Sequence, residues 1–260
     1  MIHIDKFASI KLYIIYNILE MMRTDPMPNE TVTKQSIIGK QSISEDLVSL
    51  IKQQIIDGTL NPGDRIVETK LAKELGISQT PVREAIRQLS GEGIITIVPN
   101  KGPIVRKIDS NDIFEIYSIR SFLEGFAIRL ATQYATDDDI NELAAFYQDM
   151  KTKLSDDSVK TLTAESLHIH RTIIRLSRHA RLIKMYESIS FQIALAGRIL
   201  GVISTKQKEV AQHWELVDAM IKRDPEHAER VMRSHIYQSF CECAVLMDDK
   251  DEKFEKIIWI

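Results

Sequence analysis

The spacing of apolar positions between residues 45 and 108 predicts three short helices and then a β-hairpin. In "EDLVSLIKQQIIDG", Leu47, Ile51 and Ile55 fall on one helical face, and "VETKLAKELG" forms a second short helix that Gly76 stops. A third helix follows in "ISQTPVREAIRQL". The β-branched run "IITIV", the turn "PNKG" and the run "PIVRKI" then predict two strands. This order is typical of a winged helix-turn-helix, and a small helical subdomain with a hairpin lid is the alternative.

The third of these helices has a polar side whose role depends on its surroundings. Thr80 is predicted to cap it, with Pro81 in its first turn. Four apolar side chains share one face at helical spacing, namely Val82, Ala85, Ile86 and Leu89. Gln79, Arg83 and Arg87 lie off this face, where a solvated surface is the ordinary interpretation. Between a preceding short helix and a hairpin, however, the segment is expected to be a recognition helix that enters the major groove of DNA.

From Asp109 onward the pattern changes to long amphipathic helices without strand signals. Helices are predicted over about 109–134, 137–153, 160–177, 180–200, 206–223 and 225–247. The connections are short, so neighbouring helices should be antiparallel. The predicted fold is therefore mainly α, a winged helix-turn-helix over 41–108 followed by an all-α antiparallel bundle over 109–247. An N-terminal extension (1–40), flexible or with an extra helix, and a C-terminal tail (248–260) flank the two domains.

Composition and charge fit a soluble chain that attracts nucleic acid only locally. Of the 260 residues, 44% are hydrophobic and 27% charged, and the net charge is -3. Residues 44–107 carry nine lysines and arginines against eight aspartates and glutamates, a net of +1. DNA binding would therefore depend on a local surface and on a dimer. The only two cysteines, Cys241 and Cys243, are predicted to be plain helix residues in a reducing cytoplasm.

No uninterrupted apolar run reaches the roughly 18 residues of a membrane span. The nearest candidate, "FASIKLYIIYNILEMM", also lacks the cleavage-like site of a signal peptide. We interpret it as an extra amphipathic helix or as leader sequence before a start at Met21, Met22 or Met27. No membrane partner is predicted.

Three segments carry a family resemblance, namely "LNPGDRIVETKLAKELGISQTPVREAIRQLSGEGIITIVPNKGPIV", "IYSIRSFLEGFAIRLA" and "HWELVDAMIKRDPEHAERVMRSH". The first resembles the DNA-binding pattern of the GntR family of bacterial transcription regulators. The other two resemble the all-helical FCD effector domain of its FadR-like branch, so that the resemblance covers about residues 45–245. It implies that double-stranded operator DNA is a partner, that the chain forms a homodimer and that a small-molecule effector controls DNA binding.

The resemblance also implies which residues contact DNA. They are Thr69, Ser78, Gln79, Thr80, Arg83, Arg87, Lys101 and Gly102. Gln79 stands where many members have an arginine, and Thr69 replaces another frequent arginine. Arg83 is the best candidate for a guanine or phosphate contact, because a guanidinium can bind either one with two hydrogen bonds. Gln79 could read an adenine edge instead, and Arg87 could belong to a solvated face.

Three histidines, His170, His213 and His235, border the apolar stripes of three separate predicted helices. Each alone would most often be a core histidine, but together they suit a metal site in a bundle. By the resemblance they match the three histidine ligands of a divalent metal site, whose fourth ligand is an aspartate one turn before the first histidine. That position is Ser166 here. Zinc or nickel would suit three imidazole ligands, and a metal-free polar pocket is the alternative.

A charged pair, Arg120 and Glu124, interrupts a helical stripe that should be buried. The plain interpretation is an internal i,i+4 ion pair. The resemblance suggests that Arg120 binds an effector carboxylate, so Arg120, Glu124 and Ser166 are the predicted effector-binding residues. With Ser166 in place of a carboxylate, the site should be more attractive to an anion.

These features predict a regulator whose affinity for operator DNA is controlled by a small organic acid, and no enzyme. The alternative from another class is a metal-dependent enzyme that uses the three histidines. Against it, the chain contains neither HExxH nor GxSxG. A metal-sensing regulator without an organic effector is the third hypothesis.

Overall fold

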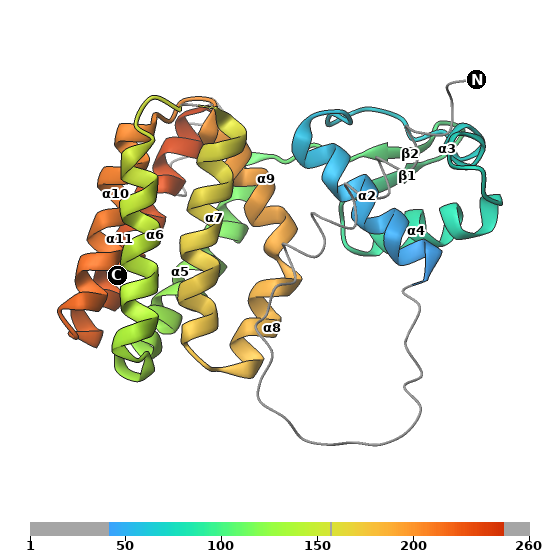
Figure 1. Ribbon diagram of the computed structural model, residues 1–260. Coiled ribbons are helices and arrows are strands. Elements are labelled where there is room, and N and C mark those ends of the chain that lie inside the picture. The colour runs from blue at the N-terminus through green and yellow to red at the C-terminus, as the bar shows by residue number, and fades with distance from the viewer. Residues whose placement is uncertain (1–41, 157, 247–260) are drawn as a thin grey trace, which may run out of the picture. The chain divides into compact units, whose positions relative to one another are not determined.

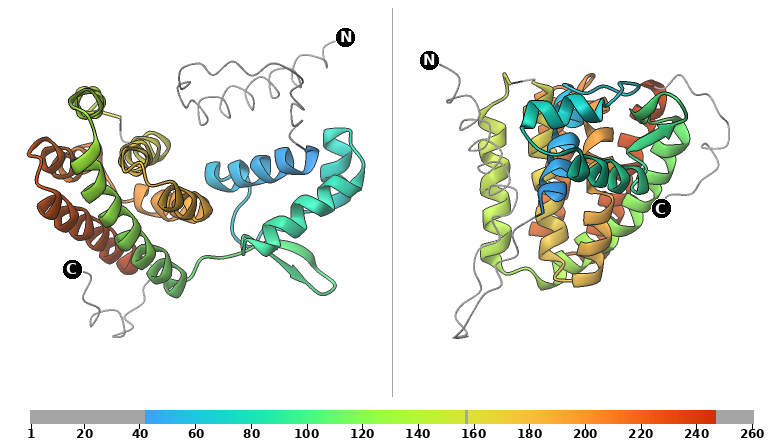
Figure 2. Two further views of the ribbon diagram at one scale, coloured as in Figure 1. Left: turned by 90° about the horizontal axis from the view of Figure 1, so that it is seen from below. Right: turned by 90° about the vertical axis from the view of Figure 1, so that its right-hand side faces the viewer.

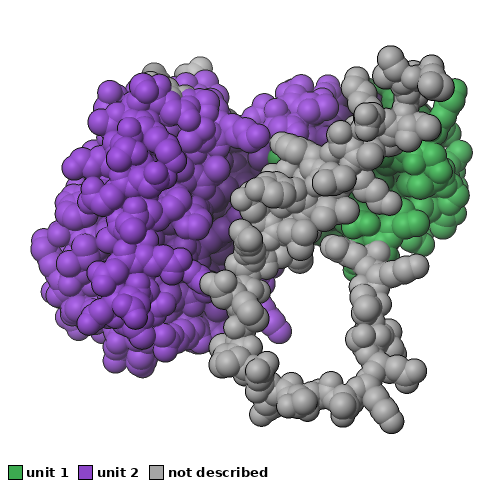
Figure 3. Space-filling view, viewed as in Figure 1, with its two compact units in different colours: residues 1–53, 66–103 green, residues 54–65, 104–260 purple. Residues whose placement is uncertain are grey.

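The computed structural model describes residues 42–156 and 158–246, which divide into two compact units. One unit contains the chain up to residue 53 together with residues 66–103, and the other contains residues 54–65 and the chain from residue 104 (Figure 3). The predictions for residues 1–40 and for the tail 248–260 lie outside the described residues.

Three helices and a two-stranded sheet follow one another in the order predicted for a winged helix-turn-helix. They are α2 (Ile43–Asp57), α3 (Glu68–Leu75), α4 (Gln79–Gly91), β1 (Ile95–Val98) and β2 (Gly102–Val105) (Figure 1). Gly76 ends α3 in the left-handed conformation, with a φ of 66°. The four apolar side chains predicted for one face of α4 are all buried. The hairpin extends away from the helices as a wing, as the left view of Figure 2 shows.

Helix α4 begins one residue earlier than the predicted cap. Thr80 lies inside the helix and Ser78 occupies the capping position, but the Ser78 side chain makes no capping hydrogen bond. A serine cap normally accepts from the backbone N–H of the second or third helical residue. Here the third helical residue is Pro81, which has no N–H. Helix α2 likewise begins two residues before Glu45, because Ser42 and Glu45 bond reciprocally to each other's backbone N–H at 3.2 and 2.9 Å.

From residue 110 the described chain is helical throughout apart from its connections. The helices are α5 (Ser110–Tyr134), α6 (Asp137–Thr152), α7 (Val159–Leu176), α8 (Ala180–Ser188), α9 (Ser190–Gly201), α10 (Lys206–Ile221) and α11 (Pro225–Leu246). Asp109 caps α5 through a reciprocal bond with Asp112. Asp224 accepts from the first-turn N–H groups of Glu226 and His227 at 3.1 and 3.0 Å, as expected of the capping residue before Pro225.

The single helix predicted over 180–200 is wrong, because Ile189 separates α8 from α9. The hydroxyl of Ser188 donates to the carbonyl of Met185 at 2.7 Å, and that of Ser190 donates to the carbonyl of Glu187 at 2.8 Å. Serine hydroxyls that bond to carbonyls of the preceding turn compete with the helical pattern. The helical spacing of apolar residues over 180–200 did not reveal this break.

The helical unit is a bundle around one apolar core. Helix α5 packs along α11 and α7, α10 packs against α6 and α11, and α7 packs against α9 (Figures 1 and 2). Residues from all seven of these helices contribute to the core, among them Ile113, Ile128, Leu143, Ile169, Leu182, Ile193, Leu216 and Ile236. Because α7, α10 and α11 face the same interior, polar side chains on their inner faces are brought together. Among the described residues, no helix is long and apolar enough to cross a membrane.

Candidate nucleic-acid interface and metal centre

Seven of the eight residues predicted to contact DNA have exposed side chains, and only Gly102 is half-buried. Thr69 lies on α3, Ser78 precedes α4, and Lys101 lies in the turn before β2. Gly102 adopts a φ of 80°, a conformation that favours glycine and that closes the wing turn. These positions leave the polar groups of α3, α4 and the wing accessible to a ligand.

Arg83 is held by two neighbours. Its Nε donates to Oε2 of Glu68 at 2.9 Å, and one of its terminal nitrogens donates to the amide oxygen of Gln79 at 3.1 Å. The Arg83 side chain is nevertheless 58% exposed. The guanidinium is therefore oriented by a carboxylate that would compete with a nucleic-acid phosphate. The sequence analysis missed Glu68, although it is the first residue of the helix that precedes the recognition helix.

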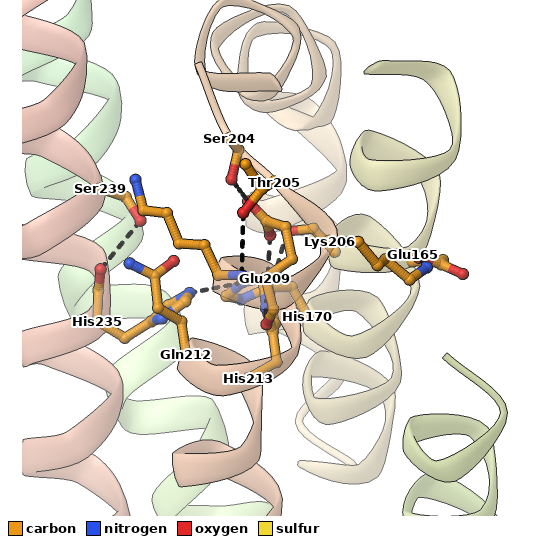
Figure 4. Close-up of polar contacts among 12 residues, drawn as sticks. Glu165, His170, Ser204, Thr205, Lys206, Glu209, Gln212, His213, His235 and Ser239 are labelled. Atoms are coloured by element: carbon orange, nitrogen blue, oxygen red, sulfur yellow. Dashed lines mark hydrogen bonds and ion pairs between the residues drawn. The ribbon is translucent and has the colours of Figure 1, made fainter. Parts of the chain in front are cut away.

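The three histidines meet in the interior of the helical unit. His170 on α7, His213 on α10 and His235 on α11 are all buried, and their nearest ring nitrogens lie within 4.8 Å of one another. The Nε2 atoms of His170 and His235 are 3.2 Å apart. Figure 4 shows the three imidazoles turned toward a common point. Three imidazole nitrogens that converge in this way are a donor set that Zn²⁺ and Ni²⁺ accept.

In two of these rings, the Nδ1 nitrogen contacts an oxygen atom of the protein. Nδ1 of His170 lies 2.5 Å from Oε2 of Glu124, and Nδ1 of His213 lies 2.8 Å from the backbone oxygen of Glu209. A carboxylate or carbonyl behind a histidine orients the ring and makes its other nitrogen a better ligand, as is usual in metal sites. The residues present therefore fit a divalent metal.

Burial and neighbouring charge set the protonation of this cluster. Burial lowers the pKa of His213 to about 3, with a further contribution from His170, and burial lowers the pKa of His235 well below its usual value. Both rings are thus neutral at pH 7 and have a lone pair to offer. Burial would raise the pKa of Glu124, but Arg120 and His170 lower it to about 2. The carboxylate behind His170 is therefore ionised.

Ser166 lies at the cluster, and its hydroxyl is 3.2 Å from Nε2 of His213. Beside it is a small cavity of about 40 Å³, which has room for a few water molecules. The polar residues that line it are Tyr117, Arg120, Thr163, Ser166, His170, Glu209, Gln212, His213, His235, Ser239 and Glu242. The side chains that surround the imidazoles can thus contact a small polar ligand.

Arg120 and Glu124 form the buried i,i+4 ion pair that was one of the two interpretations, with Nε of Arg120 2.7 Å from Oε1 of Glu124. The Arg120 guanidinium also lies 5.0 Å from the centre of the Tyr117 ring. Arg120 lines the cavity, whereas Glu124 does not. The two residues, both predicted to bind an effector, therefore differ in position, because only the arginine faces the cavity.

Several residues that line the cavity were not predicted from the sequence. Glu209 lies one turn before His213, and Glu242 lies two turns after His235, so each shares a helical face with a histidine. Their helical spacing from a predicted metal ligand is the signal that could have identified both residues. Glu242 accepts from Lys208 at 2.7 Å, and burial raises the pKa of Glu209. His179, whose role was open, caps α8, because its Nδ1 accepts from the N–H of Leu182 at 3.2 Å.

The winged unit and the bundle each match a family model. Residues 43–105 match "Bacterial regulatory proteins, gntR family", and residues 115–238 match "FCD domain". The Nta operon transcriptional regulator of Aminobacter aminovorans is 34% identical over 181 residues, which are 69% of this chain and 84% of that protein. The gluconate operon transcriptional repressor of Bacillus licheniformis is 24% identical, over 81% of this chain and 84% of that protein.

A solved structure, Escherichia coli McbR/YncC, shares the fold with a TM-score of 0.66 and 23% identity, and the match covers 80% of this chain and 98% of that one. The two matched models together span most of the described residues. The relatives are transcriptional regulators, so the enzyme hypothesis is set aside. The chain belongs to the gntR family of bacterial regulatory proteins, and it is a DNA-binding transcription regulator with an FCD effector domain.

Proposed function

We propose that the chain is a cytoplasmic homodimer in which a small organic acid, bound in the bundle beside a divalent metal, changes the affinity of α4 and the wing for operator DNA. The observation that carries this proposal is the cavity in which three imidazoles and Arg120 meet. The free cysteines Cys241 and Cys243 agree with a reducing compartment. Effector and DNA must then alter each other's affinity by the same factor.

A carboxylate suits the cationic side of the cavity. Arg120 lines it with a guanidinium, and the gluconate operon repressor among the relatives is named for a hydroxy acid. Glu209 and Glu242 also line the cavity. The pairing of Glu242 with Lys208 and the raised pKa of Glu209 reduce their repulsion of an anion. A volume of about 40 Å³ requires a small effector or an outward shift of the helices on binding.

The metal would be held by His170, His213 and His235, with Ser166 where the resemblance implies a fourth ligand. When bound, the metal would supply a positive charge and an open coordination position to an effector oxygen. Glu124 and the Glu209 carbonyl orient the rings.

The deciding experiment combines a gel shift with a thermal-shift panel. The full chain should retard its own promoter DNA in preference to a scrambled duplex, and one or more carboxylates or sugar acids should weaken or strengthen that retardation. Zn²⁺ or Ni²⁺ should raise the melting temperature. If no sequence preference emerges even at low salt, the proposal fails, whereas a response to metal without any response to acids favours the metal-sensing alternative.

The Glu68→Gln variant is expected to bind operator DNA about two- to fivefold more tightly. The substitution frees the Arg83 guanidinium from a competing carboxylate, and exposed ion pairs of this kind are worth about 0.2–1 kcal/mol. Glu74→Gln is the matched control, because it removes the same charge from α3 but its carboxylate lies 3.8 Å from Lys70 instead. Titration by fluorescence anisotropy measures both. Weaker binding by Glu68→Gln than by the control would show that Glu68 positions Arg83 for DNA.

The Ser166→Asp variant is expected to bind Zn²⁺ about tenfold or more tightly and to bind a carboxylate effector more weakly. A carboxylate beside His213 adds an anionic ligand to a site of neutral donors and takes away positive charge. Ser166→Asn is the control of similar size without the charge. Competition with a chelator and calorimetry of the acid measure the two effects, and unchanged zinc affinity would place position 166 outside the metal site.

A further inference from the structure

The cavity beside the three imidazoles runs along the bundle toward the start of α7 and the end of α11. Thr163, which lines it on α7, lies seven residues before His170. Ser239 and Glu242 line it on α11, four and seven residues after His235. Because a helix rises about 1.5 Å per residue, Thr163 and Glu242 lie about 10 Å along the helices from the imidazoles. We call the part of the cavity lined by Thr163, Ser239 and Glu242 its far end.

The far end offers hydrogen-bond acceptors. An ionised carboxylate only accepts, and that of Glu242 takes a hydrogen bond from Lys208 at 2.7 Å and a longer one from Gln212 at 3.4 Å. The Ser239 hydroxyl donates its hydrogen to the backbone oxygen of His235 at 3.0 Å, so that its own oxygen is left as an acceptor (Figure 4). A ligand group that donates hydrogen bonds would therefore be complementary to this part of the cavity.

Thr163 adds a buried hydroxyl that has no hydrogen-bond partner among the described residues. Buried polar groups are nearly always paired, because an unpaired one costs free energy of folding. Gly197 and Gly201 of α9 line the cavity next to it, and a Cβ on Gly201 would lie 3.3 Å from Oγ1 of Thr163. No side chain of these two residues occupies the space beside the hydroxyl, which is thus available to a ligand.

The end of the cavity at the imidazoles has the opposite preference. Arg120 lines the cavity one turn before Glu124, and the Glu124 carboxylate contacts His170. A guanidinium only donates, so it suits a carboxylate of the effector. The divalent metal proposed above would add positive charge at the same end. The cavity therefore favours an acceptor at the imidazoles and a donor at the far end.

We infer that the effector is a short carboxylic acid with a hydroxyl or ammonium group at its other end, and that Glu242, Ser239 and Thr163 select for this group. Contacts of about 2–3 Å at each end leave about 5 Å between the carboxylate and the donor, which matches a chain of three or four carbons. A plain alkyl acid would leave the acceptors of the far end without a partner, and a dicarboxylic acid would place a second negative charge beside Glu242. The inference rests on the proposed function and names the chemical class of its effector.

Four acids of equal chain length test this selection, namely butyrate, succinate, 4-hydroxybutyrate and 4-aminobutyrate. In calorimetry of the full chain with Zn²⁺ present, at least one of the two donor-bearing acids is expected to bind about tenfold or more tightly than butyrate and succinate. Tighter binding of 4-hydroxybutyrate identifies a hydroxyl as the selected group, and tighter binding of 4-aminobutyrate identifies an ammonium. The inference is overturned if butyrate or succinate binds as tightly as both donor-bearing acids, or if none of the four binds at millimolar concentration.

Thr163→Val keeps the shape of the side chain and removes its hydroxyl. It is expected to bind the better donor-bearing acid about fivefold more weakly and to leave butyrate within about twofold. Because this hydroxyl has no partner in the described residues, the melting temperature should not fall. Thr172→Val is the matched control, since Thr172 lies on the same helix but does not line the cavity. Equal affinities of the wild type and Thr163→Val for that acid would remove Thr163 from the selecting group.

Glu242→Gln keeps the size of the side chain and removes its charge. It is expected to bind succinate about tenfold more tightly than the wild type does, because the second carboxylate no longer meets a negative charge and an amide can donate to it. Butyrate should bind within about twofold. Glu215→Gln, at an exposed glutamate of α10 that does not line the cavity, is the control. A melting temperature checks that the loss of the pair with Lys208 leaves the fold intact. Unchanged succinate affinity in a folded Glu242→Gln protein would contradict selection by Glu242.

The inference and the proposed function fail in different ways. Calorimetry of the acids involves no DNA, whereas retardation of promoter DNA tests the regulator. Equal affinity for the four acids, together with retardation that responds to them, would reject selection at the far end and leave the regulator intact. A lack of sequence-specific retardation would reject the regulator whatever the calorimetry gives.

Discussion

Replacing Arg83 with alanine is expected to weaken operator binding roughly 30-fold or more. A guanidinium that contacts a guanine or a phosphate contributes about 1–3 kcal/mol, and the proposed homodimer would lose two such contacts. Arg83 is exposed on α4, where its guanidinium can exchange the Glu68 carboxylate for a group of the DNA. Gel shifts or fluorescence anisotropy at fixed salt would measure the loss.

The matched control is Arg230→Ala, which removes an exposed arginine from α11 in the other unit. It should leave the affinity within about twofold. The kind of contact can be resolved as well. A lost phosphate contact lowers affinity for all duplexes and reduces the salt slope by about one, whereas a lost base contact relaxes the preference at one position. Wild-type affinity of Arg83→Ala at physiological salt would remove Arg83 from the interface.

Replacing His213 with alanine is expected to abolish specific metal binding. With two imidazoles left, the set of three converging nitrogens is lost, and none of the neutral groups nearby replaces it. In the wild type, saturation at 100 times the dissociation constant stabilises the fold by about 2.7 kcal/mol, which corresponds to roughly 5–10 °C for a unit of this size. The variant should show none of this shift with Zn²⁺ or Ni²⁺, and a chelator should lower only the wild-type melting temperature.

His227→Ala serves as its control, because His227 lies at the start of α11, outside the cluster. It should bind one metal ion per chain, as we expect of the wild type, by elemental analysis after dialysis. An identical thermal response of the wild type and His213→Ala would favour the metal-free polar pocket.

Much of the architecture could be predicted from residues that act locally. The buried face of α4, the Gly76 stop and the Asp224 cap depend on neighbours within a turn or two, so periodicity and capping preferences reveal them. The break at Ile189 could not be predicted in this way. Two serine hydroxyls bond to backbone carbonyls at this point, and serines are equally compatible with an exposed helical face.

The candidate site shows the same difference between local contacts, which could be predicted, and contacts between helices, which could not. His170, His213 and His235 could be selected because each borders an apolar stripe, but the distances between them depend on how three helices pack. The contact of Glu124 with His170 likewise joins α5 to α7. Sequence spacing predicted only the pairing of Glu124 with Arg120, which lies one turn away on the same helix. Glu68 was missed for the same reason, since it lies 15 residues from Arg83.

Helix α5 faces a cavity on one side and solvent on the other, and this has a consequence for how the sequence can vary. Arg120 and Glu124 are buried, whereas Phe122 and Phe126 between and beside them are exposed. Tolerance in a saturation mutational scan of α5 should therefore repeat with a period of about 3.6 residues. The intolerant positions should be those of the buried side, where Arg120 lines the cavity and Glu124 contacts His170.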